Sequence, residues 1–135
     1  MPVKYFFKNV IEKADCLLYN KRKRKKEFSK MEKHTWYAKL HPNMLEEYKR
    51  RHDEIWPEMV EVLKSAGIKN YTIWNHGDML FGYYECEYGY AYAKKVQDES
   101  EVVKRWDVSM APIMTFPKDE KTNAPFDFDC VFVLD

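Results

Sequence analysis

The sequence predicts an α+β domain with the ferredoxin-like, split βαβ arrangement. Its predicted elements run strand, helix, strand, strand, helix, strand, an order that forms a four-stranded antiparallel sheet covered by helices on one face. The chain of 135 residues has the length of one domain. Apolar residues make up 45% and aromatic residues 16% of it, which is enough to fold a single core.

The first predicted strand is followed by two helices. Residues 35–40 are predicted to form the strand, and residues 44–52 the first helix. A proline cannot lie deep within a helix but suits its first position. Trp56-Pro57 therefore separates this helix from a second one over 58–66. Gly67 is a suitable end for the second helix.

The second half of the folded part is predicted to begin with a β-hairpin. The turn residues Asn-His-Gly-Asp at 75–78 separate strands over 71–74 and 79–87. The remaining predicted elements are helices over 92–97 and 101–114, a loop over 117–125 and a last strand over 128–134.

Both faces of the predicted sheet are apolar. On the strand over 79–87, one side presents Met79, Phe81 and Tyr83, and the other presents Leu80, Tyr84 and Cys86. An antiparallel sheet with one face in water shows more polar residues on that face. The sequence therefore predicts that both faces are covered, the second by another copy of the chain in a homodimer that packs sheet against sheet.

The first thirty residues differ in charge from the rest. They hold ten Lys or Arg against three Asp or Glu, a balance of +7, whereas the other 105 residues have a balance of −6. The basic run 21–26 is compatible with a tail for nucleic acid or an anionic surface, and also with a solvated extension. We expect residues 1–30 to form a basic, poorly ordered leader. Residues 31–135 are expected to form the folded domain, whose acidic balance does not favour nucleic-acid binding.

The sequence also predicts the compartment in which the protein works. No apolar run is long enough to span a bilayer, so no membrane partner is expected. A secretory signal is not expected either, since no continuous apolar segment precedes a small-residue cleavage site. The cysteines Cys16, Cys86 and Cys130 are far apart and form no CxxC pair, which favours free thiols in a reducing cytoplasm.

Tyr48 and His52 are the first candidates for chemistry. They lie four residues apart, so a helix places them on one face, one turn from each other. A histidine gives and takes protons near neutrality, and a tyrosine one turn away can hold a hydroxylated substrate. A histidine at a helix end is also often a surface or capping residue, so the pair alone leaves both interpretations open.

Tryptophan and tyrosine are frequent throughout the folded part. Their rings and polar edges suit the apolar faces and polar rims of sugars, although aromatic residues also fill cores and dimer interfaces. Trp106 followed by Asp107 combines a ring that can stack on a sugar with a carboxylate that can accept its hydroxyl protons. The same pair is compatible with a helix surface that carries one core tryptophan.

The sequence contains no motif for a metal, a nucleotide or an activated nucleophile. The four histidines form no HxH or HExxH pair. GxSxG, GxGxxG and P-loop motifs are missing as well. The residues therefore give no local signature of a metal site and no support for a phosphate-binding loop.

The run EEYKRRHDEIWPE, from Glu46 to Glu58, closely resembles a motif of the L-rhamnose mutarotases. Residues 62–67 and Asn70-Tyr71 also resemble that family, and the similarity extends from Trp36 to Leu134. The resemblance implies a dimeric, ferredoxin-like α/β-barrel enzyme, an isomerase of carbohydrate metabolism without a metal or cofactor. It implies that this enzyme interconverts the α and β anomers of a 6-deoxyhexose, with L-rhamnose as the expected sugar.

The resemblance also implies roles for five residues. His52 is the proton donor, and Tyr48 and Tyr71 contact the sugar. Trp106 and Asp107 align with a pair of tryptophans on the family's last helix, so the second tryptophan is replaced in this chain. The replacement opens L-fucose or another deoxysugar as the substrate. A non-catalytic small-ligand-binding module with the same barrel fold and an α/β-barrel monooxygenase are also compatible with this scaffold, because one fold hosts many functions.

Overall fold

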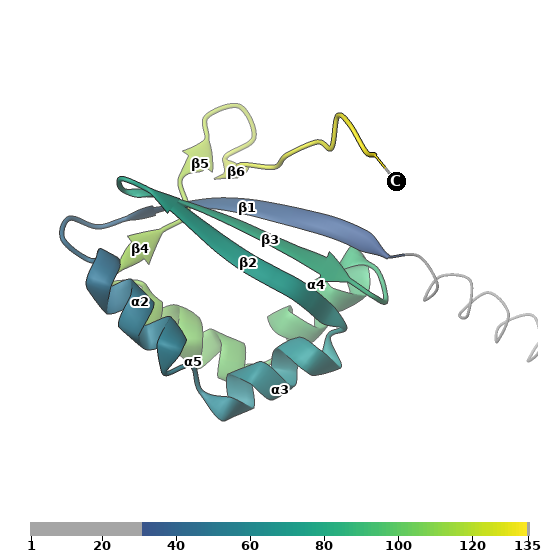
Figure 1. Cartoon of the computed structure of the whole chain (residues 1–135), viewed down its shortest axis with the longest axis horizontal. Helices are drawn as coiled ribbons and strands as arrows, with labels where there is room; N and C mark the ends of the chain where they lie inside the picture. Colours follow the sequence, from purple (N-terminus) through teal and green to yellow (C-terminus); the bar gives the residue numbers. More distant parts are fainter. Residues whose placement is uncertain (1–30, 135) are drawn as a thin grey trace, which may run out of the picture.

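The computed structural model describes residues 31–134, which form a four-stranded antiparallel sheet with helices on one face. The strands are β1 (Glu32–Leu40), β2 (Ile68–His76), β3 (Met79–Cys86) and β4 (Met114–Thr115), in the order β2-β3-β1-β4. The helices on one face are α2 (Leu45–Asp53), α3 (Pro57–Ser65), α4 (Tyr90–Asp98) and α5 (Glu101–Met110) (Figure 1). The predicted α+β class and ferredoxin-like arrangement are confirmed. The leader predicted over residues 1–30 lies outside the described residues and stays a prediction.

The break predicted at Trp56-Pro57 separates α2 from α3. Pro57 is the first residue of α3, where its fixed φ and missing N–H suit a helix N-terminus. Gly67 follows α3 with a φ of 75°, a left-handed conformation that glycine adopts without strain. The two helices consequently cover different ends of the sheet (Figure 1).

The strand predicted over 128–134 is wrong. Among the described residues, this segment pairs with no strand, and β4 takes the fourth position of the sheet by pairing with Lys39 and Leu40 of β1. An alternating apolar pattern indicates a segment that needs a partner surface, but it does not say which sheet edge receives it.

The helix predicted over 101–114 ends earlier, at Met110. The chain turns there because Ile113 enters the core, where it is 2% exposed. The carbonyl oxygen of Ile113 accepts a hydrogen bond from the backbone N–H of His41 at 2.8 Å. This contact brings Met114 beside the end of β1 and so creates β4.

Two clusters of buried side chains join the helices to the sheet. The first consists of Ala38, Leu40, Tyr48, Leu80, Met110 and Ile113, and the second of Ala66, Ile68, Tyr84, Cys86 and Ala93. The members from β3 are alternate residues, as expected for the strand side that faces the helices. The first cluster holds α2 and α5 over the same part of the sheet, with Trp36 and Trp106 packed against it. This end of the sheet positions the candidate site.

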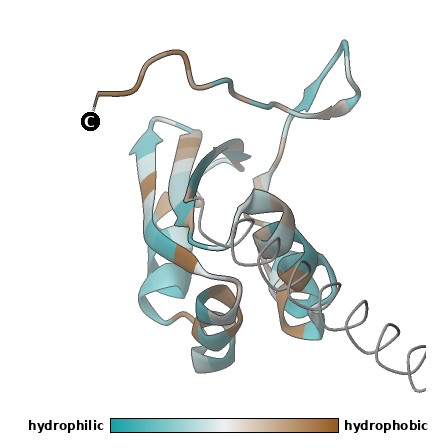
Figure 2. Ribbon diagram, turned by 90° about the vertical axis from the view of Figure 1, so that its right-hand side faces the viewer, coloured by the Kyte–Doolittle hydropathy of each residue, from teal (hydrophilic) through white to brown (hydrophobic). Residues whose placement is uncertain are grey.

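The sheet face opposite the helices carries the C-terminal part of the chain. The hairpin of β5 (Lys118–Asp119) and β6 (Ala124–Pro125) lies on that side, as do the residues that follow it (Figures 1 and 2). Phe126 contacts Tyr37 edge-on with ring centroids 5.9 Å apart, and Phe128 contacts Phe81 in the same way at 5.6 Å. The C-terminal segment therefore lies against the apolar open face.

Between residues 31 and 134, no helix combines the length and the apolar character that a membrane crossing requires. Both cysteines in this part of the chain are free thiols; Cys86 is buried and Cys130 is exposed.

Candidate active site

The helix α2 places Tyr48 and His52 one turn apart. Their rings stack with centroids 4.1 Å apart and planes inclined by 28°. Tyr48 is only 5% exposed and belongs to the core, whereas His52 is partly buried at the edge of that core. His52 is therefore held against a ring that is itself fixed by packing.

A backbone hydrogen bond defines the tautomer of His52. Its Nδ1 lies 2.9 Å from the carbonyl oxygen of Tyr48. A carbonyl oxygen only accepts, so Nδ1 carries a hydrogen and donates it. The neutral imidazole consequently keeps its lone pair on Nε2, and Nε2 is the nitrogen available for proton transfer.

Burial changes the protonation behaviour of both rings. It lowers the pKa of His52, and the hydrogen bond to the Tyr48 carbonyl and the charge of Asp53 oppose this effect only in part. Burial raises the pKa of the Tyr48 hydroxyl above its ordinary value, so this group stays neutral near neutral pH. His52 is thus the group of the pair that can exchange a proton under physiological conditions.

Trp106 approaches His52 from α5. The two rings meet edge-on with centroids 5.4 Å apart, and Trp106 meets Trp56 in the same manner at 5.3 Å. Ser100 caps the N-terminus of the helix that carries Trp106, and its hydroxyl accepts a hydrogen bond from the N–H of Val103. Trp106 is therefore fixed between the helix end at His52 and the break before α3.

A cavity of about 340 Å³ opens beside the Tyr48–His52 pair. Its volume is within the usual range for small-molecule sites. The lining is mostly aromatic or apolar and comes from β1, α2, α5 and the segment after α5: Trp36, Tyr48, His52, Trp106, Asp107, Met110, Ala111, Met114, Thr115 and Phe116. The structure thus brings Tyr48, His52, Trp106 and Asp107 to one cavity.

Tyr71 lies on the other side of the pair. It lines a neighbouring cavity of about 400 Å³, which shares Tyr48 and His52 with the first one and extends between α2 and β2. The Tyr71 hydroxyl accepts a hydrogen bond from Nε1 of Trp36 at 3.0 Å. Burial raises the pKa of this hydroxyl. Tyr71 is therefore linked to the first cavity through Trp36 without lining it.

Asp107 stands at the rim of the first cavity, one residue after Trp106. The residue is exposed on its outer side, and its carboxylate has no hydrogen bond or ion pair with any residue between 31 and 134. Partial desolvation by the surrounding protein atoms raises its pKa, and the charge of Asp98 adds to this effect.

Trp36 also lines the first cavity, although the sequence did not distinguish it from the other aromatic residues. Its ring lies directly on Gly82, the residue opposite it in the β1–β3 ladder. A Cβ at Gly82 would be 2.0 Å from Cε2 of Trp36, so no other residue fits there without displacing the indole. No local signal connects these two residues, because they become neighbours only through the strand register.

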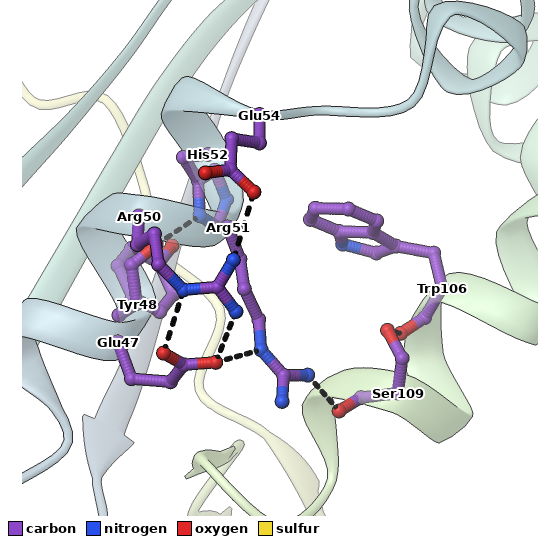
Figure 3. A network of polar contacts seen from close by, with 8 residues as sticks. All are labelled: Glu47, Tyr48, Arg50, Arg51, His52, Glu54, Trp106 and Ser109. Atoms are coloured by element: carbon purple, nitrogen blue, oxygen red, sulfur yellow. Dashed lines mark hydrogen bonds and ion pairs between the residues drawn. The ribbon is translucent and has the colours of Figure 1, made fainter.

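Arg51 ties the two helices of the site together (Figure 3). Its Nη1 donates a hydrogen bond of 2.5 Å to the carbonyl oxygen of Ser109 in α5, and its Nε donates one of 2.8 Å to Glu47. Glu47 also accepts two hydrogen bonds from Arg50, and these arginine contacts lower the pKa of Glu47 to about 2. The carboxylate thereby holds Arg51 in the orientation that reaches α5.

The described part of the chain shows no cluster of possible metal ligands. Within residues 31–134, no group of three or more His, Cys, Asp or Glu side chains is placed to hold an ion. In the cavity itself, His52 is a group that can transfer protons, and aromatic rings and Asp107 surround it.

Comparisons with known proteins point to one family. A family model described as L-rhamnose mutarotase matches residues 33–134. The L-rhamnose mutarotase of Listeria monocytogenes EGD-e is 45% identical over 92 residues, which cover 67% of this chain and 84% of that protein. The L-rhamnose mutarotase of Bacillus subtilis is 42% identical over 103 residues, covering 71% of this chain and 91% of that protein.

A solved structure agrees with these relatives. The crystal structure of an L-rhamnose mutarotase from Formosa agariphila matches with a TM-score of 0.61 and 29% identity, over 77% of this chain and 99% of that one. The family match spans β1 through the C-terminal segment and includes the α2 motif with Tyr48 and His52. With the fold, the motif and the extent of the match in agreement, this chain belongs to the L-rhamnose mutarotase family.

Proposed function

We propose that this chain interconverts the α and β anomers of L-rhamnose by opening and closing the sugar ring. The observation that carries the proposal is the stacked Tyr48–His52 pair at the wall of an aromatic cavity, in a chain of the L-rhamnose mutarotase family. Trp36 and Trp106 also line this cavity, and aromatic rings suit the apolar side of a sugar.

Ring opening needs a proton at the ring oxygen and loss of the proton from the anomeric hydroxyl. In the proposed mechanism protonated His52 gives its Nε2 proton to the ring oxygen, since Nδ1 is held by the Tyr48 carbonyl. The bond between C1 and the ring oxygen breaks, the aldehyde end rotates, and the ring closes on either face. Positioned proton transfer contributes roughly 10²–10⁴ in rate, which is sufficient because the uncatalysed reaction already proceeds in water.

Exchange NMR on the α and β anomers of L-rhamnose tests the proposal. We expect the wild-type chain to accelerate exchange and His52→Ala to lose most of the acceleration without unfolding. His76→Ala is the matched control, because this histidine is exposed at the end of β2 and lines neither cavity. Exchange at the buffer rate in the presence of wild-type protein would contradict the enzyme proposal. Sugar binding without exchange would instead favour a non-catalytic binding module.

L-Fucose or another 6-deoxyhexose is a second candidate substrate. The observation that favours it is Asp107, which places a carboxylate at the rim of an otherwise uncharged aromatic wall. A carboxylate can select among sugars that differ in the direction of a hydroxyl group. The exchange assay with a panel of 6-deoxyhexoses decides between the sugars through their kcat/KM values.

The proposal includes a homodimer in which two sheets pack face to face and form an α/β-barrel. On the face opposite the helices, Trp74 is 67% and Phe81 is 39% exposed. Further along the C-terminal segment, Val131, Phe132 and Leu134 are 94%, 76% and 84% exposed. Figure 2 shows this apolar segment extending outward on the same side. Contiguous exposed apolar surface of this kind is typical of an association site.

The proposal also places the protein in the cytoplasm. Cys86 and Cys130 are free thiols, which suits a reducing compartment. The proposed substrate, a monosaccharide, also fits an enzyme of carbohydrate metabolism in that compartment.

A further inference from the structure

Ring opening requires two groups that act on different oxygens. One proton must reach the ring oxygen while another leaves the anomeric oxygen. The imidazole of His52 has a single nitrogen free for this task, because Nδ1 is bonded to the Tyr48 carbonyl at 2.9 Å. His52 cannot serve both oxygens at once, so the site calls for a second proton-transfer group.

The cavity offers few groups for that role. Of the residues that line it, Tyr48, His52 and Asp107 are the titratable ones. The Tyr48 hydroxyl is buried and stays protonated, so it can donate a hydrogen bond but does not act as a base near neutrality. Asp107 remains as the one carboxylate among the lining residues.

We infer that Asp107 is a further catalytic residue, whose carboxylate takes the proton of the anomeric hydroxyl while His52 protonates the ring oxygen. The inference rests on the proposed anomer exchange and names the base that this reaction needs. The two groups come from different helices, and Trp106, the neighbour of Asp107, contacts His52 at 5.4 Å between ring centroids. His52 and Asp107 both line this cavity, so a sugar bound in it can reach both groups.

The carboxylate of Asp107 is free to act on a substrate. Its basic neighbours on α5 are already paired, Lys104 with Glu101 and Arg105 with Glu58. Among residues 31–134 nothing accepts from, donates to or forms an ion pair with the Asp107 side chain. A carboxylate that stabilised the helix surface would be expected to use one of these cations.

The proposed step balances in protons and electrons. The anomeric O–H proton moves to a carboxylate oxygen of Asp107, and its bonding pair forms the C1=O1 double bond. The bond between C1 and the ring oxygen breaks, and the ring oxygen takes the proton from Nε2 of His52. Ring closure on the other face returns both protons, so each group regains its starting state.

The test uses Asp107→Asn and Asp107→Ala in the full chain, measured by anomer exchange. An asparagine still accepts a hydrogen bond but takes no proton, so we expect kcat to fall by roughly 10²-fold or more with little change in KM. We expect added formate to restore activity to Asp107→Ala but not to His52→Ala. Glu101→Gln, on the solvent side of the same helix, is the matched control and should keep the wild-type rate.

The outcomes separate this inference from the proposed function. If wild type accelerates exchange and Asp107→Asn keeps its kcat, the base assignment is overturned while the mutarotase proposal stands. A loss in Asp107→Asn that appears only in KM would make Asp107 a binding residue and would also overturn the assignment. No acceleration by wild type overturns both. Circular dichroism and the melting temperature show whether each variant is folded, and formate rescue keeps the Ala variant informative.

Discussion

His52 donates a hydrogen bond from Nδ1 to the Tyr48 carbonyl, which leaves Nε2 for proton transfer in the cavity. This hydrogen bond follows from helix geometry, since a side chain can reach back to the carbonyl oxygen four residues earlier. Packing against Tyr48 then fixes the ring plane. At the scale of single residues, the site is thus a histidine whose tautomer and orientation are set before any substrate arrives.

The pH dependence of activity follows from the pKa of His52. Burial lowers this pKa below 6.5, while Asp53 on the same helix opposes the shift; Tyr48 and Asp107 are the titratable groups that share the cavity. The proton donor must be protonated, so we expect kcat/KM to fall as the pH rises through a pKa below 6.5. Stopped-flow polarimetry or exchange NMR, corrected for buffer catalysis, measures the profile. A falling limb centred above pH 6.5 would contradict the assignment.

The contact of Trp36 with Gly82 gives a second prediction at this scale. Gly82→Ala places a methyl group 2.0 Å from the indole, which must move. We expect a loss of about 1–3 kcal/mol in the free energy of unfolding, as for other overpacked sites. KM should rise as well, since Trp36 lines the cavity. Urea denaturation and the exchange assay check both effects. Gly77→Asn, in open space at a φ that asparagine tolerates, should leave KM unchanged.

The helices α2 and α5 form the two walls that carry the reacting groups. They are held together by the core cluster of Tyr48 and Met110 and by the hydrogen bond from Arg51 to the Ser109 carbonyl (Figure 3). Arg51 precedes His52, and Ser109 lies one turn after Trp106. The separation of the walls therefore depends on a charged side chain that spans them.

Arg51→Met tests this connection between the helices. It keeps much of the aliphatic stem and removes the bonds to Ser109 and Glu47, so we expect about 1–2 kcal/mol of lost stability and a lower kcat. Arg50→Met is the matched control, because Arg50 also bonds Glu47 but makes no bond to α5. Equal kinetic losses in both variants would show that the charge of Glu47, rather than the link to α5, matters.

At the scale of the whole molecule, the sheet has one face covered by helices and one face that is apolar and partly open (Figures 1 and 2). The C-terminal segment covers some of that open face through Phe126 and Phe128, and its last residues contact little. A surface of this composition is costly to leave in water.

Light scattering and substitution test the dimer that this surface implies. We expect the wild-type chain to have the mass of two chains at micromolar concentration. Phe81→Asp combined with Trp74→Asp should give the mass of one chain, because both side chains lie on the open face. The pair Glu61→Ala and Lys95→Ala, on exposed positions of the helical layer, should remain dimeric. A monomeric wild-type chain would rule out the proposed assembly.

Local features of the fold could be predicted from the sequence because each is encoded within a few neighbouring residues. The break at Pro57 follows from the missing N–H of proline, and the hairpin around Gly77 follows from its turn residues. The same holds for the placement of Tyr48 and His52 one turn apart, which needs only the helical repeat. The longer motif around them, from Glu46 to Glu58, also identified the family.

Only the tertiary structure decided which distant elements meet. Ile113 is drawn into the core and makes β4 the fourth strand, which leaves the apolar segment over 128–134 outside the sheet of its own chain. The register of β1 against β3 sets Trp36 on Gly82, and helix packing brings Asp107 to the cavity of His52. These contacts join residues far apart in the chain, and they depend on how side chains fill a shared core, which no local pattern records.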